Sequence, residues 1–277
     1  SYPIFGTKGR WENICKKIKK IKKINFLFLK QNFDLKLLSN NPGLLTGYYE
    51  PEILVSKKRN KKFKIPILKY NNSYKNLSRE IITKNFNEKD VLLWTDDKID
   101  LFFLQIQGSG IGVLQNKKRI KISYAGNNNK AYTSIGKYLF KEKLMTREIN
   151  LFTIKKFLRN NLELTNEILN QNERYIFFKL DETNITKNTK GALGRTLTPN
   201  LSIAIDNKYY PLGLPILIKK IKDNKNIFSI SMDVGSAIKG KNRADLFSGR
   251  GVAGEKLAGD LKDEIFLYTL VPSEAND

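Results

Sequence analysis

The sequence contains no histidine and a single cysteine, Cys15, among 277 residues. The absence of histidine excludes Ser-His-Asp and Cys-His nucleophilic catalysis, histidine general bases and histidine-containing zinc sites. One cysteine excludes a disulfide within the chain and a cysteine cluster, and we expect Cys15 to be a free, packed thiol. Any catalysis by this chain must therefore use carboxylates, Lys, Tyr, Ser or Thr.

Long apolar runs are also absent. The longest, such as residues 101–104, are strand-sized and far short of the roughly 20 residues of a membrane span. A length of 277 residues suits two hydrophobic cores, because single cores stop growing near about 250 residues. The chain begins at Ser1 without Met and without a charged-then-apolar leader, so we expect any leader to lie outside this sequence.

Acidic residues are few: 27 Asp+Glu against 50 Lys+Arg give a net charge of +23. This balance favours an anionic partner, but an AT-rich genome, with its bias to Lys, Asn and Ile, also explains it. Arginine, which nucleic-acid sites favour, is scarce. The lysines of residues 16–23 alternate with Ile18, Ile21 and Ile24, which indicates a basic amphipathic helix with a solvated face or, alternatively, a membrane-surface role.

Periodicity predicts two β-rich blocks with a helical insert between them, after a mainly helical segment over residues 1–40. Expected strands cover residues 44–49, 63–68, 91–94, 101–106, 119–124, 201–205, 216–221, 227–232 and 265–271. Expected helices begin at Thr133 or Ser134, at Asn150 and near Thr165, and a short one covers residues 253–261. We expect a hairpin around residues 112–119 and an exposed loop or linker over residues 181–190.

Two aspartates carry the most informative pattern. Asp233 ends an apolar strand, Asp245 opens another, and a Gly-rich segment joins them. Two neighbouring acids, or one acid in an apolar setting, can raise a carboxyl pKa as general acid catalysis on a glycosidic oxygen requires. An Asp of pKa ~3.9 is about 0.1% protonated at pH 7, whereas one of roughly 6 is about 10% protonated. The alternative is that both are turn residues bonded to backbone amides.

Two further segments suggest a binding surface. In an alternating strand Tyr48 and Glu50 share one face, where tyrosine stacks on a sugar ring or packs on apolar side chains. Gln105 and Gln107 likewise share one face of an expected strand that precedes Gly108. Such a face suits hydroxyl and amide recognition, or is simply a polar exposed face.

Six segments together resemble, in order, the family of membrane-bound lytic murein transglycosylase A. They are residues 47–51, 102–110, 124–126 with 132–136, 174–178, 191–199 with 210–215, and 233–249. The likeness runs from about residue 42 to residue 271.

The resemblance implies a mainly β, two-domain architecture with a few helices and a large groove between the domains. A discontinuous double-psi β-barrel catalytic domain would comprise residues 1–51 and 183–277. An inserted β-domain with a helical segment would comprise residues 52–182.

The resemblance also implies cleavage of the β-1,4 bond between N-acetylmuramic acid and N-acetylglucosamine in peptidoglycan, without water, leaving a 1,6-anhydro ring. A single acid serves, and it maps to Asp245, with Asp233 orienting or tuning it. No cofactor and no metal are implied. The implied substrate-binding residues are Tyr48, Glu50, Gln105, Gln107, Gly108, Ser109, Tyr124, Ala125, Gly126, Tyr132, Ser134 and Lys239.

The implied partners are peptidoglycan glycan strands and not nucleic acid. The protein is expected to be a monomer in the periplasm, attached to the outer membrane of a Gram-negative bacterium through a lipid anchor outside this chain. Its positive charge suits the carboxylates of murein peptide stems.

The chain departs from the family pattern at Ser236, where a second glycine is usual, and at residues 127–129, where asparagines stand in place of a frequent histidine. The family position at Glu50 varies. These departures bear on substrate contacts rather than on the reaction. Two alternatives stay open: an inverting glycoside hydrolase that uses Asp233 or Glu50 to activate water, and a non-catalytic wall-binding module. A nucleic-acid binder ranks last, since charge alone supports it.

Overall fold

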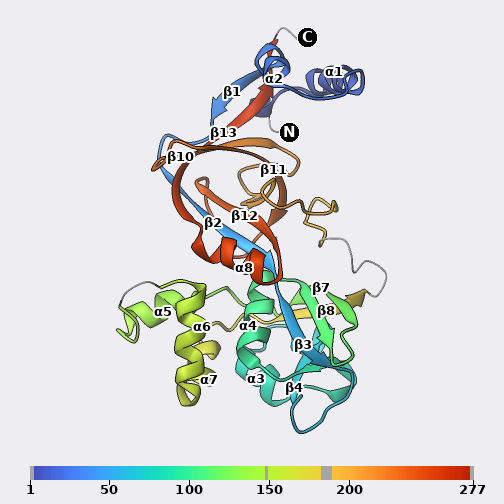
Figure 1. Ribbon diagram of the computed structural model, residues 1–277, viewed down its shortest axis with the longest axis vertical. Helices are drawn as coiled ribbons and strands as arrows, with labels where there is room; N and C mark the ends of the chain where they lie inside the picture. The colour runs from blue at the N-terminus through green and yellow to red at the C-terminus, as the bar shows by residue number, and fades with distance from the viewer. Residues whose placement is uncertain (1–2, 147–148, 182–188, 275–277) are drawn as a thin grey trace. The chain divides into compact units, whose positions relative to one another are not determined.

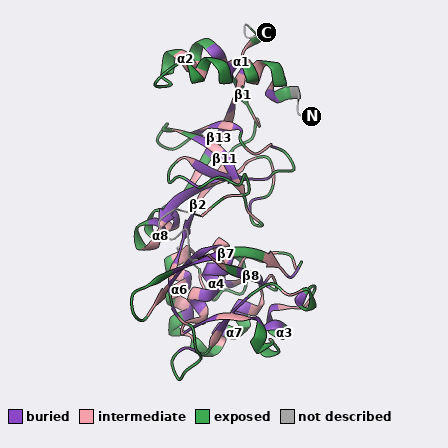
Figure 2. Ribbon diagram, turned by 90° about the vertical axis from the view of Figure 1, so that its right-hand side faces the viewer, coloured by how far each residue is buried: buried purple, intermediate pink, exposed green. Residues whose placement is uncertain are grey.

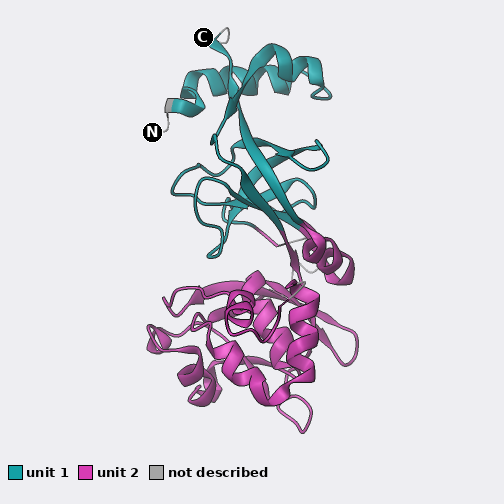
Figure 3. Ribbon diagram, turned by 90° about the vertical axis from the view of Figure 1, so that its left-hand side faces the viewer, with its two compact units in different colours: residues 1–46, 191–247, 262–277 teal, residues 47–190, 248–261 magenta. Residues whose placement is uncertain are grey.

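The structure is a computed structural model that describes residues 3–146, 149–181 and 189–274. The chain divides into two compact units, coloured in Figure 3: unit 1 holds residues 1–46, 191–247 and 262–277, and unit 2 holds residues 47–190 and 248–261. The bounds differ from the expected ones: residues 47–51, 189–190 and 248–261, expected in the barrel domain, cluster with unit 2.

Unit 1 is a closed β-barrel with two helices beside it (Figure 1). Its elements are the 3-10 helix η1 (Pro3–Phe5), α1 (Lys8–Lys19), α2 (Phe26–Asn32), β1 (Phe33–Leu37), β2 (Gly43–Glu50), β9 (Ser202–Ile205), β10 (Pro215–Lys220), β11 (Asn226–Val234), β12 (Arg243–Arg250) and β13 (Lys262–Pro272). Strands β2 and β12 continue into unit 2.

The barrel closes because β13 pairs at one end with β2 and further along with β10. The circuit runs β2–β12–β9–β11–β10–β13 and returns to β2, while β1 extends the far end of β13. Side chains that alternate along the strands, such as Leu45, Ile203, Leu246 and Ile265, are fully or almost fully buried and form the core. The mainly β, two-domain fold with a barrel is therefore confirmed.

The N-terminal segment is mainly helical, as predicted, although it ends in the unpredicted strand β1. Helix α1 buries Ile14, and Trp11 packs its ring against Phe33 with centroids 5.9 Å apart. The prediction that Cys15 is packed is wrong, because Cys15 is a free thiol that is exposed on α1.

Unit 2 is built on a six-stranded sheet of order β4–β5–β3–β6–β7–β8. Its strands are β3 (Glu52–Ser56), β4 (Ile65–Leu68), β5 (Val91–Thr95), β6 (Gly110–Leu114), β7 (Arg119–Asn127) and β8 (Ile176–Asp181). Its helices are η2 (Asn72–Tyr74), α3 (Arg79–Lys84), η3 (Glu88–Asp90), α4 (Lys98–Gln107), α5 (Ile135–Lys141), α6 (Leu151–Asn160), α7 (Leu162–Asn170) and α8 (Gly251–Asp260). The predicted hairpin is β6–β7, an antiparallel pair.

Predicted helix starts are confirmed by their caps. The Ser134 hydroxyl accepts a hydrogen bond from the Lys137 amide at the start of α5. Asn150 and Thr153 form a reciprocal capping box at the start of α6. Both caps satisfy amides that a helix leaves without partners in its first turn.

The strand expected over residues 101–106 is wrong, because these residues belong to helix α4. The Asp97 carboxylate caps α4 by accepting from the amides of Ile99 and Asp100, and Gly108 ends it at φ 84°. Figure 1 shows α4 between the sheet and helices α6 and α7. It therefore buries apolar side chains on both sides, and its nearly continuous apolar run resembles that of a buried strand.

Among the described residues, every helix is too short or too polar to cross a bilayer. Of the loop expected over residues 181–190, residues 182–188 lie outside the described ranges. Asp181 is the last residue of β8.

Candidate active site

Two aspartates lie at the same level of the barrel wall, on either side of one residue of β9. Asp233 on β11 is opposite Ala204 in a parallel pair, and Asp245 on β12 is opposite Ala204 in an antiparallel pair. Residues opposite each other on adjacent strands project from the same face of a sheet. The two carboxyl groups therefore share one face, with backbones two strand spacings, or about 10 Å, apart.

Asp245 is a half-buried carboxyl group with one hydroxyl partner. The Thr46 hydroxyl donates a hydrogen bond to Asp245 Oδ1 at 2.6 Å. Burial raises the pKa of Asp245 to about 6, although the Thr46 bond and the Arg243 charge oppose that rise; the Asp233 charge adds to it. A carboxyl of that pKa is about 10% protonated at pH 7, so Asp245 is able to donate a proton near neutrality.

The direction of the Thr46 hydrogen bond is set by Arg243. The Arg243 guanidinium donates to Thr46 Oγ1 at 3.2 Å and to the Leu44 carbonyl at 3.2 Å. Because a guanidinium only donates, the Thr46 hydroxyl accepts from Arg243 and directs its own proton to Asp245. This series of bonds holds the carboxyl in one orientation.

Sequence reasoning missed both Thr46 and Arg243. Arg243 precedes Asp245 by two positions and so lies on the same face of β12, which was a usable signal. Nothing in the sequence around Thr46 predicts its role. Thr46 contacts Asp245 only because strands β2 and β12 pair, and the two residues are 199 positions apart in the chain.

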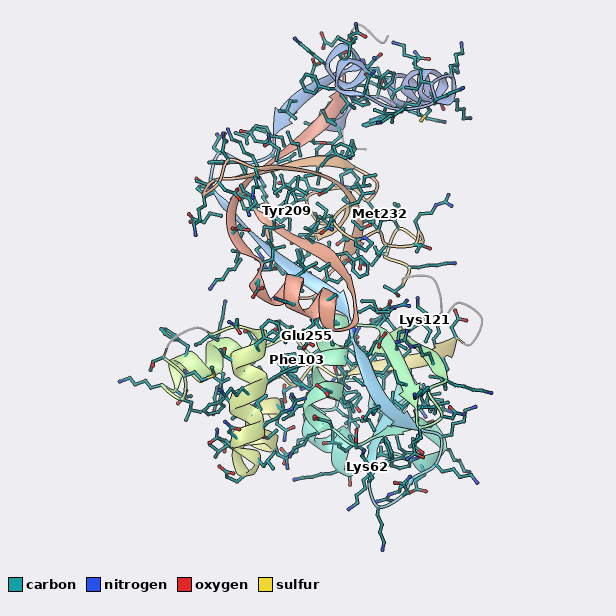
Figure 4. The ribbon with its side chains drawn as sticks, in the orientation of Figure 1. Lys62, Phe103, Lys121, Tyr209, Met232 and Glu255 are labelled. Carbon is teal, nitrogen blue, oxygen red and sulfur yellow. The ribbon has the colours of Figure 1, made fainter. Side chains whose placement is uncertain are left out.

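Asp233 has a different environment. Its Oδ1 accepts hydrogen bonds from the Ala192 amide at 3.0 Å and from the Val234 amide at 2.9 Å. Gly191 packs against the backbone of Met232, which is labelled in Figure 4. A Cβ atom at position 191 would lie 2.3 Å from the Met232 carbonyl oxygen. The backbone-amide alternative therefore describes Asp233, which ties residues 191–192 to β11, but not Asp245.

The segment between the two aspartates is anchored on both sides of Lys239, whose side chain is exposed. The Gly240 amide donates to Asp206 Oδ2 at 2.8 Å, and the Tyr210 hydroxyl donates to the Lys241 carbonyl at 2.8 Å. Although burial of Asp206 opposes it, hydrogen bonds from backbone amides hold the pKa of that carboxyl below its ordinary value. The position of Lys239 is thus fixed by the backbone around it.

Glu50, expected on a binding face, is buried in unit 2. Its Oε2 lies 2.7 Å from Arg250 Nη2, and its Oε1 lies 3.4 Å from Lys121 Nζ on β7, labelled in Figure 4. Tyr48 is also buried. Glu50 therefore holds the ends of β2 and β12 against β7, which is a structural role and not an open contact surface.

Gln105 and Gln107 do not share a face, because they lie two positions apart on a helix rather than on a strand. Gln105 is buried, accepts from Arg79 at 2.5 Å and donates to the Ile176 carbonyl. Gln107 Oε1 accepts from the Tyr49 amide at 3.0 Å. Both amides thus organise unit 2.

The remaining predicted residues differ in exposure. Tyr124 has an exposed ring whose hydroxyl accepts from Asn127 at 2.7 Å. Ala125 is exposed, Gly126 lies against Tyr70, and Ser109 is buried. Gly108 ends α4, Ser134 caps α5, and Tyr132 is half-buried.

Asp233 and Asp245 lie on one face of the barrel wall of unit 1, and Lys239 belongs to the same unit. The other predicted residues belong to unit 2. Within the described residues, no group of three or more His, Cys, Asp or Glu side chains is arranged to hold a metal ion.

A barrel wall that carries one carboxyl of raised pKa, oriented by a hydroxyl, defines a candidate acid–base enzyme. Profiles of known families match both parts of the chain: an MltA-specific insert domain over residues 44–179 and a 3D domain over residues 201–271.

The chain is 33% identical over 267 residues to a membrane-bound lytic murein transglycosylase A homolog of Buchnera aphidicola, covering 89% of this chain and 72% of that protein. It is 32% identical to membrane-bound lytic murein transglycosylase A of Vibrio cholerae, covering 79% of this chain and 62% of that protein. The solved structure of Escherichia coli MltA with bound chitohexaose matches with a TM-score of 0.75 and 26% identity, covering 83% of this chain and 72% of that one.

The chain therefore belongs to the membrane-bound lytic murein transglycosylase A family. Membership places it among the lytic murein transglycosylases, lyases that act on peptidoglycan.

Proposed function

We propose that this chain cleaves the β-1,4 bond between N-acetylmuramic acid and N-acetylglucosamine with Asp245 as its only acid and base. The observation that carries the proposal is the half-buried Asp245 carboxyl, with a pKa of about 6, hydrogen-bonded to Thr46. The chain has no histidine that could share the task.

The proposed reaction has two proton transfers. Protonated Asp245 donates its proton to the glycosidic oxygen as the bond from that oxygen to C1 of the muramic acid breaks. The resulting carboxylate then takes the proton of the C6 hydroxyl while O6 bonds to C1, which closes the 1,6-anhydro ring. Asp245 ends protonated, as it began, and no water is consumed.

Thr46 and Asp233 support this cycle in different ways. The Thr46 hydrogen bond stabilises the carboxylate that forms after the first transfer and keeps it oriented for the second. The Asp233 charge favours the protonated form that begins the cycle. Asp233 Oδ1 is already engaged by two backbone amides, which argues against Asp233 as the water-activating base of an inverting hydrolase.

For substrate contacts we propose the predicted residues that are exposed, Lys239 in unit 1 and Tyr124 and Ala125 in unit 2, together with the half-buried aromatic Tyr132. The tyrosine rings are suited to stack on sugar rings. The chitohexaose bound to the E. coli relative supports a β-1,4-linked glycan as ligand. Lys239 carries a charge complementary to the carboxylates of murein peptide stems.

We further propose that the protein acts as a monomer in the periplasm, at the outer membrane, through a lipid anchor outside this chain. The relatives' description as membrane-bound, in Gram-negative species, supports an envelope location.

The test is digestion of purified peptidoglycan in water enriched in heavy oxygen, followed by mass spectrometry of the fragments. We expect anhydro-muropeptides, one water lighter than hydrolysis products and free of the label. Labelled fragments with reducing ends would instead identify a hydrolase. Binding with no released fragment would identify a wall-binding module.

A further inference from the structure

The N-terminal helices of unit 1 carry a surface that the proposed reaction does not use. Residues 13–33 contain seven lysines and neither Asp nor Glu. Residues 21–27, which link α1 to α2 and include the first two residues of α2, are exposed without a break. Figure 2 colours most of both helices as exposed. We name this the α1–α2 surface; it consists of Ile21, Ile24, Phe26 and Leu27 with the exposed lysines Lys16, Lys19, Lys20, Lys22, Lys23 and Lys30.

The apolar part of the α1–α2 surface is unusually open. Phe26 is 80% exposed and Leu27 is 58% exposed, at adjacent positions of one helix. Ile21 and Ile24 are also exposed nearby in the chain. Single exposed apolar residues are ordinary, but a group of large ones framed by polar residues marks an interaction site.

This exposure does not come from a loosely packed helix. Asn25 caps α2 by accepting from the Phe28 amide at 2.8 Å, and Phe28 packs against Phe33 with ring centroids 6.4 Å apart. Lys17 Nζ donates to Asn32 Oδ1 at 2.9 Å and so joins α1 to α2. The helix is anchored by Phe28, and Phe26 and Leu27 project elsewhere.

The two properties of the surface together select one kind of partner. The lysines attract an anionic partner, and the exposed Phe and Leu gain stability only where they leave water. An anionic polymer, such as murein with its peptide carboxylates, satisfies the charges but gives no apolar interior for Phe26. A bilayer of anionic lipid satisfies both, since lysines meet the headgroups while Phe and Leu enter the acyl boundary.

We propose that the α1–α2 surface binds anionic lipid bilayers directly. The contact is made by this chain's own residues, and it is separate from Asp245 and from any covalent lipid. Lipid binding by the α1–α2 surface is a function additional to the proposed reaction, and the two are tested by separate experiments.

The test is co-sedimentation of the whole chain with phosphatidylcholine vesicles prepared with and without phosphatidylglycerol. We expect strong binding to the anionic vesicles, weak binding to the neutral ones, and loss of the anionic preference as salt is raised. Equal binding to both vesicle types, or none to either, would overturn the proposal.

The apolar requirement is tested with Phe26→Ser/Leu27→Ser. Its matched control is Phe140→Ser/Leu162→Ser, which replaces the same residue types at 62% and 61% exposure in unit 2. We expect the first pair to lower the partition coefficient about tenfold or more, as for loss of two interfacial side chains, and the control to leave it unchanged. Retained binding by Phe26→Ser/Leu27→Ser would overturn the proposal.

The charge requirement is tested by replacing Lys19, Lys20, Lys22 and Lys23 with Gln. The control replaces the exposed lysines Lys58, Lys61, Lys75 and Lys89 of unit 2 with Gln, which changes the net charge equally. Loss of vesicle binding only in the first set supports a local surface. Equal loss in both sets would show attraction by net charge and overturn the proposal.

Two other occupants are outcomes of the same experiments. Self-association abolished by Phe26→Ser/Leu27→Ser, without vesicle binding, would identify a second copy as the partner. Binding to purified peptidoglycan abolished by the same variant, without vesicle binding, would identify the wall polymer. Cleavage of soluble glycan strands by this variant should be unchanged, which separates the lipid surface from the reaction.

Discussion

Thr46 and Asp245 are joined by a 2.6 Å hydrogen bond between two neighbouring strands of one barrel, although 199 positions separate them in the chain. Arg243 donates to the same hydroxyl, so the proton on Thr46 is directed to the carboxylate. These two hydrogen bonds explain how a single acid can be both desolvated and oriented.

Thr46→Val removes the hydroxyl while keeping the shape of the side chain. Since the Thr46 hydrogen bond lowers the pKa of Asp245, its loss should move that pKa above about 6 and shift the alkaline limb of the pH–rate profile upward. Loss of carboxylate orientation should lower kcat about tenfold. Thr46→Ser keeps the donor and should resemble the wild type; an unshifted profile in Thr46→Val would contradict the assigned contact.

The wild-type pH dependence follows from the same group. Asp245 must be protonated to begin the reaction, so kcat/KM should fall as pH rises through about 6, with a tenfold loss per unit of pH beyond it. The measurement is release of soluble fragments from peptidoglycan across pH 4.5 to 9. A constant rate over that range would show that no group of this pKa limits the reaction.

Asp245 should also reduce the stability of the folded protein near neutrality. Its folded pKa lies above its ordinary value of 3.8, so the folded state binds the extra proton and stability falls as pH rises from about 4 to about 6. Asp245→Asn should therefore raise the free energy of unfolding by about 1–3 kcal/mol at pH 7 and by little at pH 4.

Asp223→Asn is the control, because Asp223 lies in the same unit and its pKa is shifted in the opposite direction to that of Asp245. Although desolvation opposes it, the hydrogen bonds from Lys220 and Lys225 hold the pKa of Asp223 below its ordinary value. The ionised Asp223 carboxylate stabilises the folded state at neutral pH, and this stabilisation is lost as pH falls. Asp223→Asn should therefore be no more stable than the wild type at pH 7. Denaturant unfolding at both pH values checks the pair, and the same change in both variants would contradict the burial of Asp245.

Glu50→Gln should destabilise unit 2. Glu50 is buried between Arg250 and Lys121, so its neutralisation leaves buried positive charge without its partner, at a cost of about 3–5 kcal/mol. The control Glu52→Gln breaks a more exposed pair with Arg119 and should cost less than about 1 kcal/mol. Thermal unfolding of both variants checks this, and equal shifts would refute the structural role of Glu50.

Local patterns predicted much of this fold. Ser134 and Asn150 cap the helices that begin directly after them, and the predicted apolar strand that ends near Asp233 is β11. The inserted arrangement of the two domains came from the resemblance, because no periodicity reveals that distant segments share one barrel.

The errors have physical causes. Helix α4 lies between a sheet and other helices, so its apolar residues surround it and the period of 3.6 is hidden. Glu50 follows the alternation expected of a half-exposed strand, and only the tertiary neighbours Arg250 and Lys121 show that it is buried. Thr46 was missed because its partner comes from a strand that local sequence does not connect to it.

The central claim, that Asp245 alone carries both proton transfers, is tested most directly by the rate of soluble-fragment release from peptidoglycan by Asp245→Asn. The account predicts a loss of at least about a thousandfold, with circular dichroism and binding of a chitin oligosaccharide retained. Release of anhydro-muropeptides at a rate near that of the wild type would contradict it.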